Sequence, residues 1–569
     1  MRLTTTGIIA ALVLGLIPAG PAIADGLAGS YLAGRAASYE SDYEKAARYY
    51  TQAMIADPSN PRILENATSA YVNLGRVDQA HTIAQKMQFS GIESQIAHLV
   101  LTADQFKQGE YDQLLEDIAA GRRIGPLVDG LASAWAELGR GRMTEALARF
   151  DALSQENGLK GFALYHKALA LASVGDYEGA DALFSGEEQG PLRQTRRGAM
   201  AHIEVLSQLD RNTDALELLD LLFSNDTDPG IGDYRARLVA GEVLPFTHVT
   251  TASDGAAEMF FSVAGVLSTD AAPGYTLLYS RLAEYLREDH VDAILLSAAM
   301  LEDLERYELA TDSYNRVPRD HPAFHAAELG RADTLRRAGK DDAAIEVLQQ
   351  LAKSHGDLPA VHTAMGDMMR GLERFEDAIP AYDRSIALTD EENAQWFVHY
   401  ARGISYERSG NWENAEADFR RALELRPNQP LVLNYLGYSL VEKKIKLDEA
   451  LEMIETAAAE RPDSGFIIDS LGWVLYRLGR YDEAVGHMER AAELMPVDPV
   501  VNDHLGDVFW AVGRETEAQF QWKRALSFID PEDTDGEADP ERIRRKLEVG
   551  LDVVLEEEGA PPLRVANDG

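Results

Sequence analysis

The sequence predicts an all-α fold, a superhelical solenoid of stacked antiparallel helix pairs. Two observations predict it. A small or apolar residue recurs through the chain at a nearly constant spacing of about 34 residues, and each repeat carries the same order of small residues, large apolar residues and a closing proline. Amphipathic helices of unrelated lengths would not keep so constant a period. The 569 residues therefore predict about 13 or 14 stacked units in place of several compact domains.

The period can be followed from one marker residue per unit. The spacings between markers are 34, 34, 32, 34 and 35 in the first half and 34, 34, 37, 35, 34 and 34 in the second. The markers are Ala46, Ala80, Leu114, Ala146, Ala180 and Ala215, then Ala310, Ala344, Ala378, Ala415, Ala450, Ala484 and Ala518.

The unit Trp396 to Gln429 shows the pattern inside one repeat. Gly403 stands at its eighth position, large apolar residues follow, and Pro427 ends it. The small residues allow two helices to approach closely, and proline stops the second helix because it has no N–H and clashes with the preceding turn. This set resembles the tetratricopeptide-repeat (TPR) family, specifically at 391–530 and more loosely at 95–245.

The N-terminal segment 1–24 has the layout of a secretory signal peptide. Arg2 precedes an apolar run of 11 residues, Gly7 to Ile17, which is too short to span a bilayer, and Ala22-Ile23-Ala24 forms a small-x-small cleavage site. We expect cleavage after Ala24, a periplasmic location, and no transmembrane span in the mature chain; peripheral membrane association is left open.

The pattern divides the remaining chain into five segments. We expect an N-terminal TPR-like solenoid at 25–228, degenerate repeats and a joint at 229–290, and a C-terminal TPR solenoid at 291–530. An acidic loop and a capping helix are expected at 531–558, and a disordered tail at 559–569.

Composition excludes several classes of function. The chain has 54 Lys and Arg against 94 Asp and Glu, a net charge of −40, so nucleic acid and anionic membranes should repel it. It has no Cys, which excludes disulfides, thiolate nucleophiles, Cys-bound zinc and the Cys-linked anchor of bacterial lipoproteins.

No catalytic motif is present. The sequence has no Walker-type loop, no G-x-S-x-G and no H-E-x-x-H. His321 and His325 are four residues apart, but Pro322 lies between them and no third ligand is evident. We therefore predict a non-catalytic protein with no metal and no cofactor.

The TPR resemblance implies that the first helix of each pair lines a concave surface, and helical spacing selects the residues on that side. Aromatic and Arg residues are frequent at protein-binding hot spots, so we predict a partner-binding groove there, although each aromatic could instead pack against the neighbouring repeat. Acidic residues in the groove favour a neutral or basic ligand over a terminal carboxylate. The predicted residues are Tyr400, Arg408, Asn434, Tyr438, Asp469, Trp473, Tyr476, Arg477, Asp503, Asp507 and Trp510.

Three stretches resemble a class of Gram-negative envelope TPR adaptors that includes outer-membrane lipoproteins. They begin NYLGYSLVEKK at 434, IIDSLGWVLYR at 467 and VNDHLGDVFWA at 501. The resemblance implies a periplasmic scaffold or adaptor that binds proteins and presents substrates to an envelope protease. This chain lacks the lipid-bearing Cys of that class. Two alternatives stay open: a scaffold in an exopolysaccharide export or envelope-assembly machine, and an enzyme.

Overall fold

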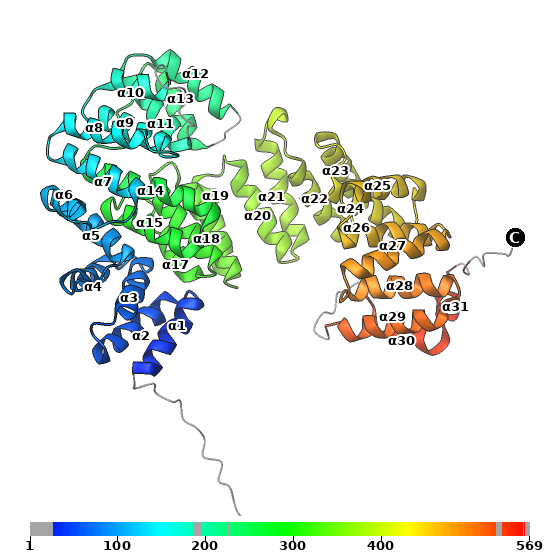
Figure 1. The fold of residues 1–569 in the computed structure, drawn as a ribbon. Helices are drawn as coiled ribbons and strands as arrows, with labels where there is room; N and C mark the ends of the chain where they lie inside the picture. Colours follow the sequence, from blue (N-terminus) through cyan, green and yellow to red (C-terminus); the bar gives the residue numbers. More distant parts are fainter. Residues whose placement is uncertain (1–26, 187–194, 225–227, 531–537, 561–562, 564–569) are drawn as a thin grey trace, which may run out of the picture. The chain divides into compact units, whose positions relative to one another are not determined.

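A computed structural model describes residues 27–186, 195–224, 228–530, 538–560 and 563. Helices α1 to α31 and one 3-10 helix account for the regular structure of these residues, and none of them lies in a strand (Figure 1). The predicted all-α solenoid is confirmed. The predicted signal peptide at 1–24, the predicted loop at 531–537 and most of the predicted tail lie outside the described residues. No described helix is both long enough and apolar enough to cross a bilayer.

The chain divides into two compact units, residues 1–348 and 349–569. The division falls inside α19. The first unit contains α1 (Leu27–Tyr39), α2 (Tyr43–Ala56), α3 (Pro61–Asn73), α4 (Val77–Phe89), α5 (Gln95–Gln108), α6 (Tyr111–Ala119), α7 (Pro126–Gly139), α8 (Met143–Ser154), α9 (Lys160–Ser173), α10 (Tyr177–Phe184), α11 (Arg196–Gln208), α12 (Asn212–Phe223), α13 (Pro229–Val239), α14 (Ala252–Asp270), α15 (Pro273–Leu286), α16 (Val291–Asp303), α17 (Tyr307–Tyr314), α18 (Phe324–Arg337) and the start of α19 (Asp341–Ser354).

The second unit is the more regular of the two. After the end of α19 it contains α20 (Pro359–Gly371), α21 (Phe375–Leu388), η1 (Glu391–Asn393), α22 (Trp396–Arg408), α23 (Trp412–Leu425), α24 (Pro430–Glu442), α25 (Leu447–Glu460), α26 (Gly465–Arg477), α27 (Tyr481–Leu494), α28 (Pro499–Ala511), α29 (Glu515–Phe528), α30 (Pro540–Val549) and α31 (Leu551–Glu557).

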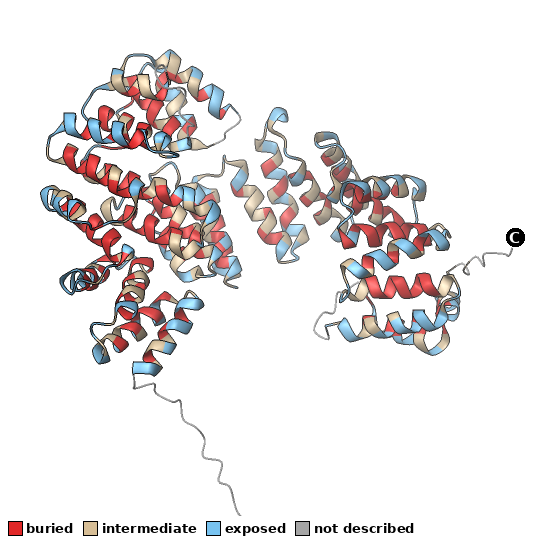
Figure 2. Cartoon of the chain, in the orientation of Figure 1, coloured by how far each residue is buried: buried red, intermediate tan, exposed pale blue. Residues whose placement is uncertain are grey.

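The small residue of each repeat lets the two helices of a pair touch. A Cβ built on Gly403 of α22 would lie 2.7 Å from the ring of Phe419 on α23, so only glycine fits there. Gly472 on α26 faces Met488 on α27 in the same way, at 2.2 Å. Phe419 and Met488 are fully buried. The apolar face of each pair is covered by its partner and by the next pair, and buried residues run along the helices of both units (Figure 2).

The segment 229–290 is the one that the sequence predicts as degenerate repeats and a joint. The structure places it inside the first unit, where α14 packs against α5, α7 and α9, and α15 packs against α3 and α5. These partners are the first helices of their pairs, so α14 and α15 fill the inner surface of the first unit. Gly255 makes the approach possible, because a Cβ there would lie 2.3 Å from the Trp135 ring on α7.

Candidate partner-binding surface

The inner surface of the second unit is lined by the first helices of successive pairs. Among these helices α20 contacts α22, α24 contacts α26, and α26 contacts α28. All the residues that the sequence predicts for the groove lie on α22, α24, α26 and α28. The structure buries six of them, leaves four half-buried and exposes Arg408.

Trp473 and Tyr476 on α26 form a stacked aromatic cluster with His504 of α28. The Trp473 ring lies 4.8 Å from the Tyr476 ring and 3.9 Å from the His504 ring, and both pairs are nearly parallel. Trp473 Nε1 donates a hydrogen bond of 2.8 Å to Glu442, and Arg477 pairs with the same carboxylate. Trp473 and Tyr476 are each only 8% exposed, so their rings mainly join neighbouring repeats.

Asp469 holds His504 in this cluster. The carboxylate lies 3.0 Å from His504 Nδ1, and both side chains are buried. Burial lowers the pKa of His504, but the Asp469 carboxylate outweighs that effect and raises the pKa above its usual value. Asp469 therefore has an intramolecular partner, the His504 ring.

The last inner helix, α28, is covered by the C-terminal helices of the chain. Lys546 on α30 is buried, and its Nζ lies 2.8 Å from Asp503 and 2.7 Å from Asp507. Trp510 Nε1 donates to Asp552 on α31 at 2.9 Å. The acidic residues Asp503 and Asp507 are predicted to favour a basic ligand. At this end of the unit, Lys546 of the same chain is that basic group.

The four remaining predicted residues lie on α22 and α24. Tyr400 is half-buried, with its ring 5.9 Å from that of Tyr435 on α24. Asn434 is buried, and its Oδ1 has no hydrogen-bond partner among the described residues. Tyr438 is half-buried, and the exposed Arg408 lies over the Phe375 ring at 5.2 Å.

Sequence reasoning missed a row of exposed apolar residues on the same helices. Phe397, Leu431 and Phe466 occupy the second position of α22, α24 and α26 and are 37%, 39% and 45% exposed. Their spacings of 34 and 35 residues repeat the period of the solenoid, which was the signal that could have found them. We call these three residues the apolar row. They offer more surface to a partner than the aromatic residues of the prediction.

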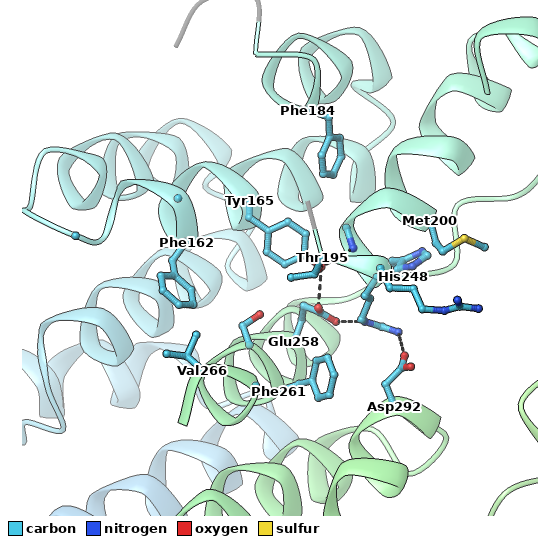
Figure 3. A pocket seen from close by; sticks show the side chains of 17 residues that line it. Phe162, Tyr165, Phe184, Thr195, Met200, His248, Glu258, Phe261, Val266 and Asp292 are labelled. Atoms are coloured by element: carbon cyan, nitrogen blue, oxygen red, sulfur yellow. Dashed lines mark hydrogen bonds and ion pairs between the residues drawn. The ribbon is translucent and has the colours of Figure 1, made fainter. Parts of the chain in front are cut away.

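The first unit contains a pocket of about 590 Å³, which we call the aromatic pocket (Figure 3). Its walls come from α9, α10, α11 and α14, and sequence reasoning missed it because repeats are irregular there. The lining residues are Gly158, Gly161, Phe162, Tyr165, Phe184, Thr195, Arg196, Arg197, Gly198, Met200, His248, Glu258, Phe261, Ser262, Gly265, Val266 and Asp292.

Charged residues meet at one side of the aromatic pocket. Arg197 donates hydrogen bonds of 2.6 Å to both Glu258 and Asp292, and Tyr165 donates one of 2.8 Å to Glu258 (Figure 3). Burial raises the pKa of Glu258, but Arg197 and His290 more than offset it and hold that pKa well below its usual range. Glu258 is therefore a buried carboxylate that depends on Arg197.

His321 and His325, which are four residues apart in the sequence, each contact nearby backbone. His321 Nδ1 accepts a hydrogen bond from the Ala323 N–H, and His325 Nδ1 lies 2.9 Å from the Pro322 carbonyl oxygen. Across the described part of the chain, no three His, Asp or Glu side chains gather in a way that could hold a metal ion.

Comparison with known proteins identifies the repeats. Models of the tetratricopeptide repeat match residues 38–90, 326–357, 396–429 and 467–496. The TPR repeat-containing protein PA4667 of Pseudomonas aeruginosa is 28% identical over 175 residues, and human tetratricopeptide repeat protein 13 is 26% identical over 171. These alignments cover 30% and 29% of this chain but only 28% and 19% of the two relatives.

The solved structures that resemble this chain superpose on it with low TM-scores. The Cut9–Hcn1 hetero-tetramer of the APC/C has a TM-score of 0.38 at 14% identity, covering 93% of this chain and 97% of the solved chain. Yeast Tom70 has a TM-score of 0.34 at 13% identity, covering 94% and 96%. Nothing about the partners of this chain follows from values this low. The helix pairs and the matched repeat models together show that both units carry tetratricopeptide repeats, which imply a scaffold for protein–protein interactions.

Proposed function

We propose that this chain is a non-catalytic periplasmic scaffold whose second unit binds partner proteins through the apolar row. The observation that carries the proposal is the repetition of Phe397, Leu431 and Phe466 at one position of three successive inner helices. Apolar side chains exposed in register on neighbouring repeats form one interaction surface, whereas single exposed apolar residues are common on any protein.

The partner is a protein segment that presents apolar side chains and carries a neutral or basic charge. Apolar side chains complement the row, and the net charge of −40 repels acidic segments. The buried contacts of Lys546 with Asp503 and Asp507 are an example in the same unit, where the inner helix α28 packs against a basic residue of α30.

Within this scaffold role we propose an adaptor that presents substrates to an envelope protease. The support is the resemblance of the segments at 434, 467 and 501 to envelope TPR adaptors, and the signal-like segment at 1–24. Osmotic-shock fractionation tests the location. Recovery of the chain with cytoplasmic markers would contradict a periplasmic scaffold.

The test of the partner surface is crosslinking and affinity capture from the periplasm with matched variants. The triple variant Phe397→Ser, Leu431→Ser, Phe466→Ser should lose most of the partner that the unaltered chain recovers. The control replaces three other exposed apolar residues of the same unit, Val497, Phe520 and Phe528, by Ser and should recover the partner normally. Equal loss in both variants, or no loss in the row variant, would refute the role of the row.

The identity of the captured partner separates the finer alternatives. Recovery of a protease together with its substrates supports the adaptor. Recovery of synthase or export-channel subunits instead indicates the exopolysaccharide or envelope-assembly machine and contradicts the adaptor. Hydrolase turnover by a purified, metal-free preparation would contradict a non-catalytic scaffold.

A further inference from the structure

We propose that the aromatic pocket of the first unit binds an apolar small molecule that has no anionic group. The pocket is independent of the apolar row, because it lies wholly within the first unit. Its volume of about 590 Å³ falls in the range of small-molecule sites, roughly 300–1,000 Å³.

The walls of the pocket present aromatic side chains from three helices. Phe162 lies on α9, Phe184 on α10 and Phe261 on α14. Met200 and Val266 add apolar side chains at opposite sides of the lining, and Val266 is 53% exposed (Figure 3). A site lined mainly by aromatic and apolar groups with a few polar groups at one side is typical of small-molecule binding.

Two helix glycines face the pocket without a packing reason. A Cβ built on Gly161 of α9 or on Gly265 of α14 would meet no atom within 4 Å. Gly255 of the same helix α14 is different, because it lies against the Trp135 ring. Glycine in the interior of a helix, as at Gly265, costs about 0.5–1 kcal/mol relative to Ala, whereas Gly161 lies in the first turn of α9. Gly161 and Gly265 therefore keep space open that a side chain could fill.

The polar side of the pocket selects against anions. The charge of Arg197 is already matched by Glu258 and Asp292, and Arg196 pairs with Asp228 at 2.8 Å. These groups carry two positive and three negative charges, so a ligand carboxylate or sulfonate would add repulsion, and no described residue of the lining offers it a cation that is not already matched. An uncharged apolar molecule meets no such penalty.

Two fluorescent probes with the same ring system test this inference on the full chain. N-phenyl-1-naphthylamine is uncharged at neutral pH, and 8-anilinonaphthalene-1-sulfonate adds one sulfonate. We expect the uncharged probe to bind the first unit at least about tenfold more tightly than the anionic one. The apolar row of the second unit could also bind the uncharged probe. We therefore compare the amount of probe bound by the unaltered chain with the amount bound by a variant whose pocket is filled.

Gly265→Leu is that variant, and Gly161→Leu fills the pocket from the facing helix. Each should remove one equivalent of bound uncharged probe while leaving helicity and the unfolding midpoint unchanged or slightly raised. Gly486→Leu is the control, because Gly486 lies on α27 in the second unit and also has no atom within 4 Å of a built Cβ.

The outcomes decide the inference. Loss of one equivalent in both pocket variants, with none lost in Gly486→Leu, supports it. Equal binding by the unaltered chain and the pocket variants overturns it, as does tighter binding of the anionic probe. If one pocket variant unfolds, the variant on the other helix gives the same readout.

Discussion

The two units are built from the same kind of helix pair, yet the inner surface is filled in the first unit and largely open in the second. In the first unit α14 and α15 lie along the inner helices and fill that surface. In the second unit the apolar row stays exposed, and α30 and α31 cover only the last inner helix. The repeat determines how helices pair, whereas the segments between and after the repeats determine which surface is left for a partner.

The contacts at the two filled surfaces are of the same chemical kind. Glu258 of α14 is buried against Arg197 of α11, and Lys546 of α30 is buried against Asp503 and Asp507 of α28. A buried ion pair adds little net stability over an apolar contact, but removing one partner leaves an uncompensated charge. Such pairs make the position of each packed helix specific, and they give the sharpest means of testing the comparison.

The largest expected effect is from Glu258→Ala in the first unit. The change leaves the half-buried Arg197 guanidinium with only the half-exposed Asp292 as a carboxylate partner and removes the acceptor of the Tyr165 hydroxyl. We expect a loss of about 3–5 kcal/mol in the unfolding free energy of the first unit, measured by urea denaturation.

The matched control is Asp292→Ala, which removes the other carboxylate from the same Arg197. Because the Asp292 side chain is 48% exposed, its loss should change stability by at most about 1 kcal/mol. Equal effects of the two variants would show that the packing of α14 does not depend on the buried carboxylate.

A somewhat smaller effect is expected from Lys546→Ala in the second unit. The variant leaves the buried Asp503 without its lysine and Asp507 with only Arg542, 3.6 Å away, but α30 lies at the end of the unit and can move away to let water reach them. We expect a loss of about 3 kcal/mol, near the lower end for breaking a buried ion pair.

Limited proteolysis should show cleavage near α30 before the rest of the second unit in the Lys546→Ala variant. Arg544→Ala changes an exposed neighbour on the same helix and should leave the cleavage pattern unaltered. An unchanged pattern in Lys546→Ala would mean that its ion pairs do not hold the C-terminal helices in place.

Acidification should lower the stability of the first unit more than that of the second. Burial lowers the pKa of His166 in the first unit to about 4, below its unfolded value near 6.5, so its proton binds more strongly in the unfolded chain. From pH 7 to pH 5 this residue alone should remove about 2 kcal/mol from the first unit. His504 in the second unit has a raised pKa, so its contribution is fully present below pH about 6.5 and is lost as pH rises through its folded pKa.

Hydrogen exchange followed by mass spectrometry, corrected for intrinsic exchange rates, resolves the two units at each pH. Peptides of the first unit should lose protection at pH 5 while those of α26 to α28 keep theirs. His166→Gln should remove the loss that this residue causes. Parallel loss in both units would contradict the assignment of opposite pKa shifts.

The sequence predicted the helix pairs of the solenoid, because their packing residues recur with the repeat. Gly403 and Phe419, or Gly472 and Met488, recur at fixed positions because every pair needs one close approach and one large residue beside it. The inner packing of α14 could not be predicted from the period, because its contacts with α5, α7 and α9 join residues that are far apart in the chain.

The residues predicted for the groove lie on the first helices of their pairs, but most of them are less exposed than a binding surface requires. Trp473 lies on the inner helix as expected, but His504 of the next repeat stacks on it, and Glu442 of the previous repeat accepts its N–H. Helical spacing shows which side of a helix a residue occupies, and the neighbouring repeats then determine how much of it stays exposed. The same argument identifies Phe397, Leu431 and Phe466, whose position in the repeat lies beyond those contacts.

The smallest effects are expected at Gly265 and Gly486, and a larger effect of opposite sign is expected at Gly472, although the sequence alone does not distinguish these three helix glycines. Gly265→Ala in the first unit and Gly486→Ala in the second should each raise the unfolding free energy by about 0.5–1 kcal/mol, because each residue is inside a helix and a Cβ meets no atom within 4 Å. Gly472→Ala on α26 should instead lower it by about 1–3 kcal/mol, because a Cβ would lie 2.2 Å from Met488 Sδ. Chemical denaturation of the three variants measures these signs. A stabilising Gly472→Ala would show that the close approach of the helices, which explains the repeat itself, is not needed.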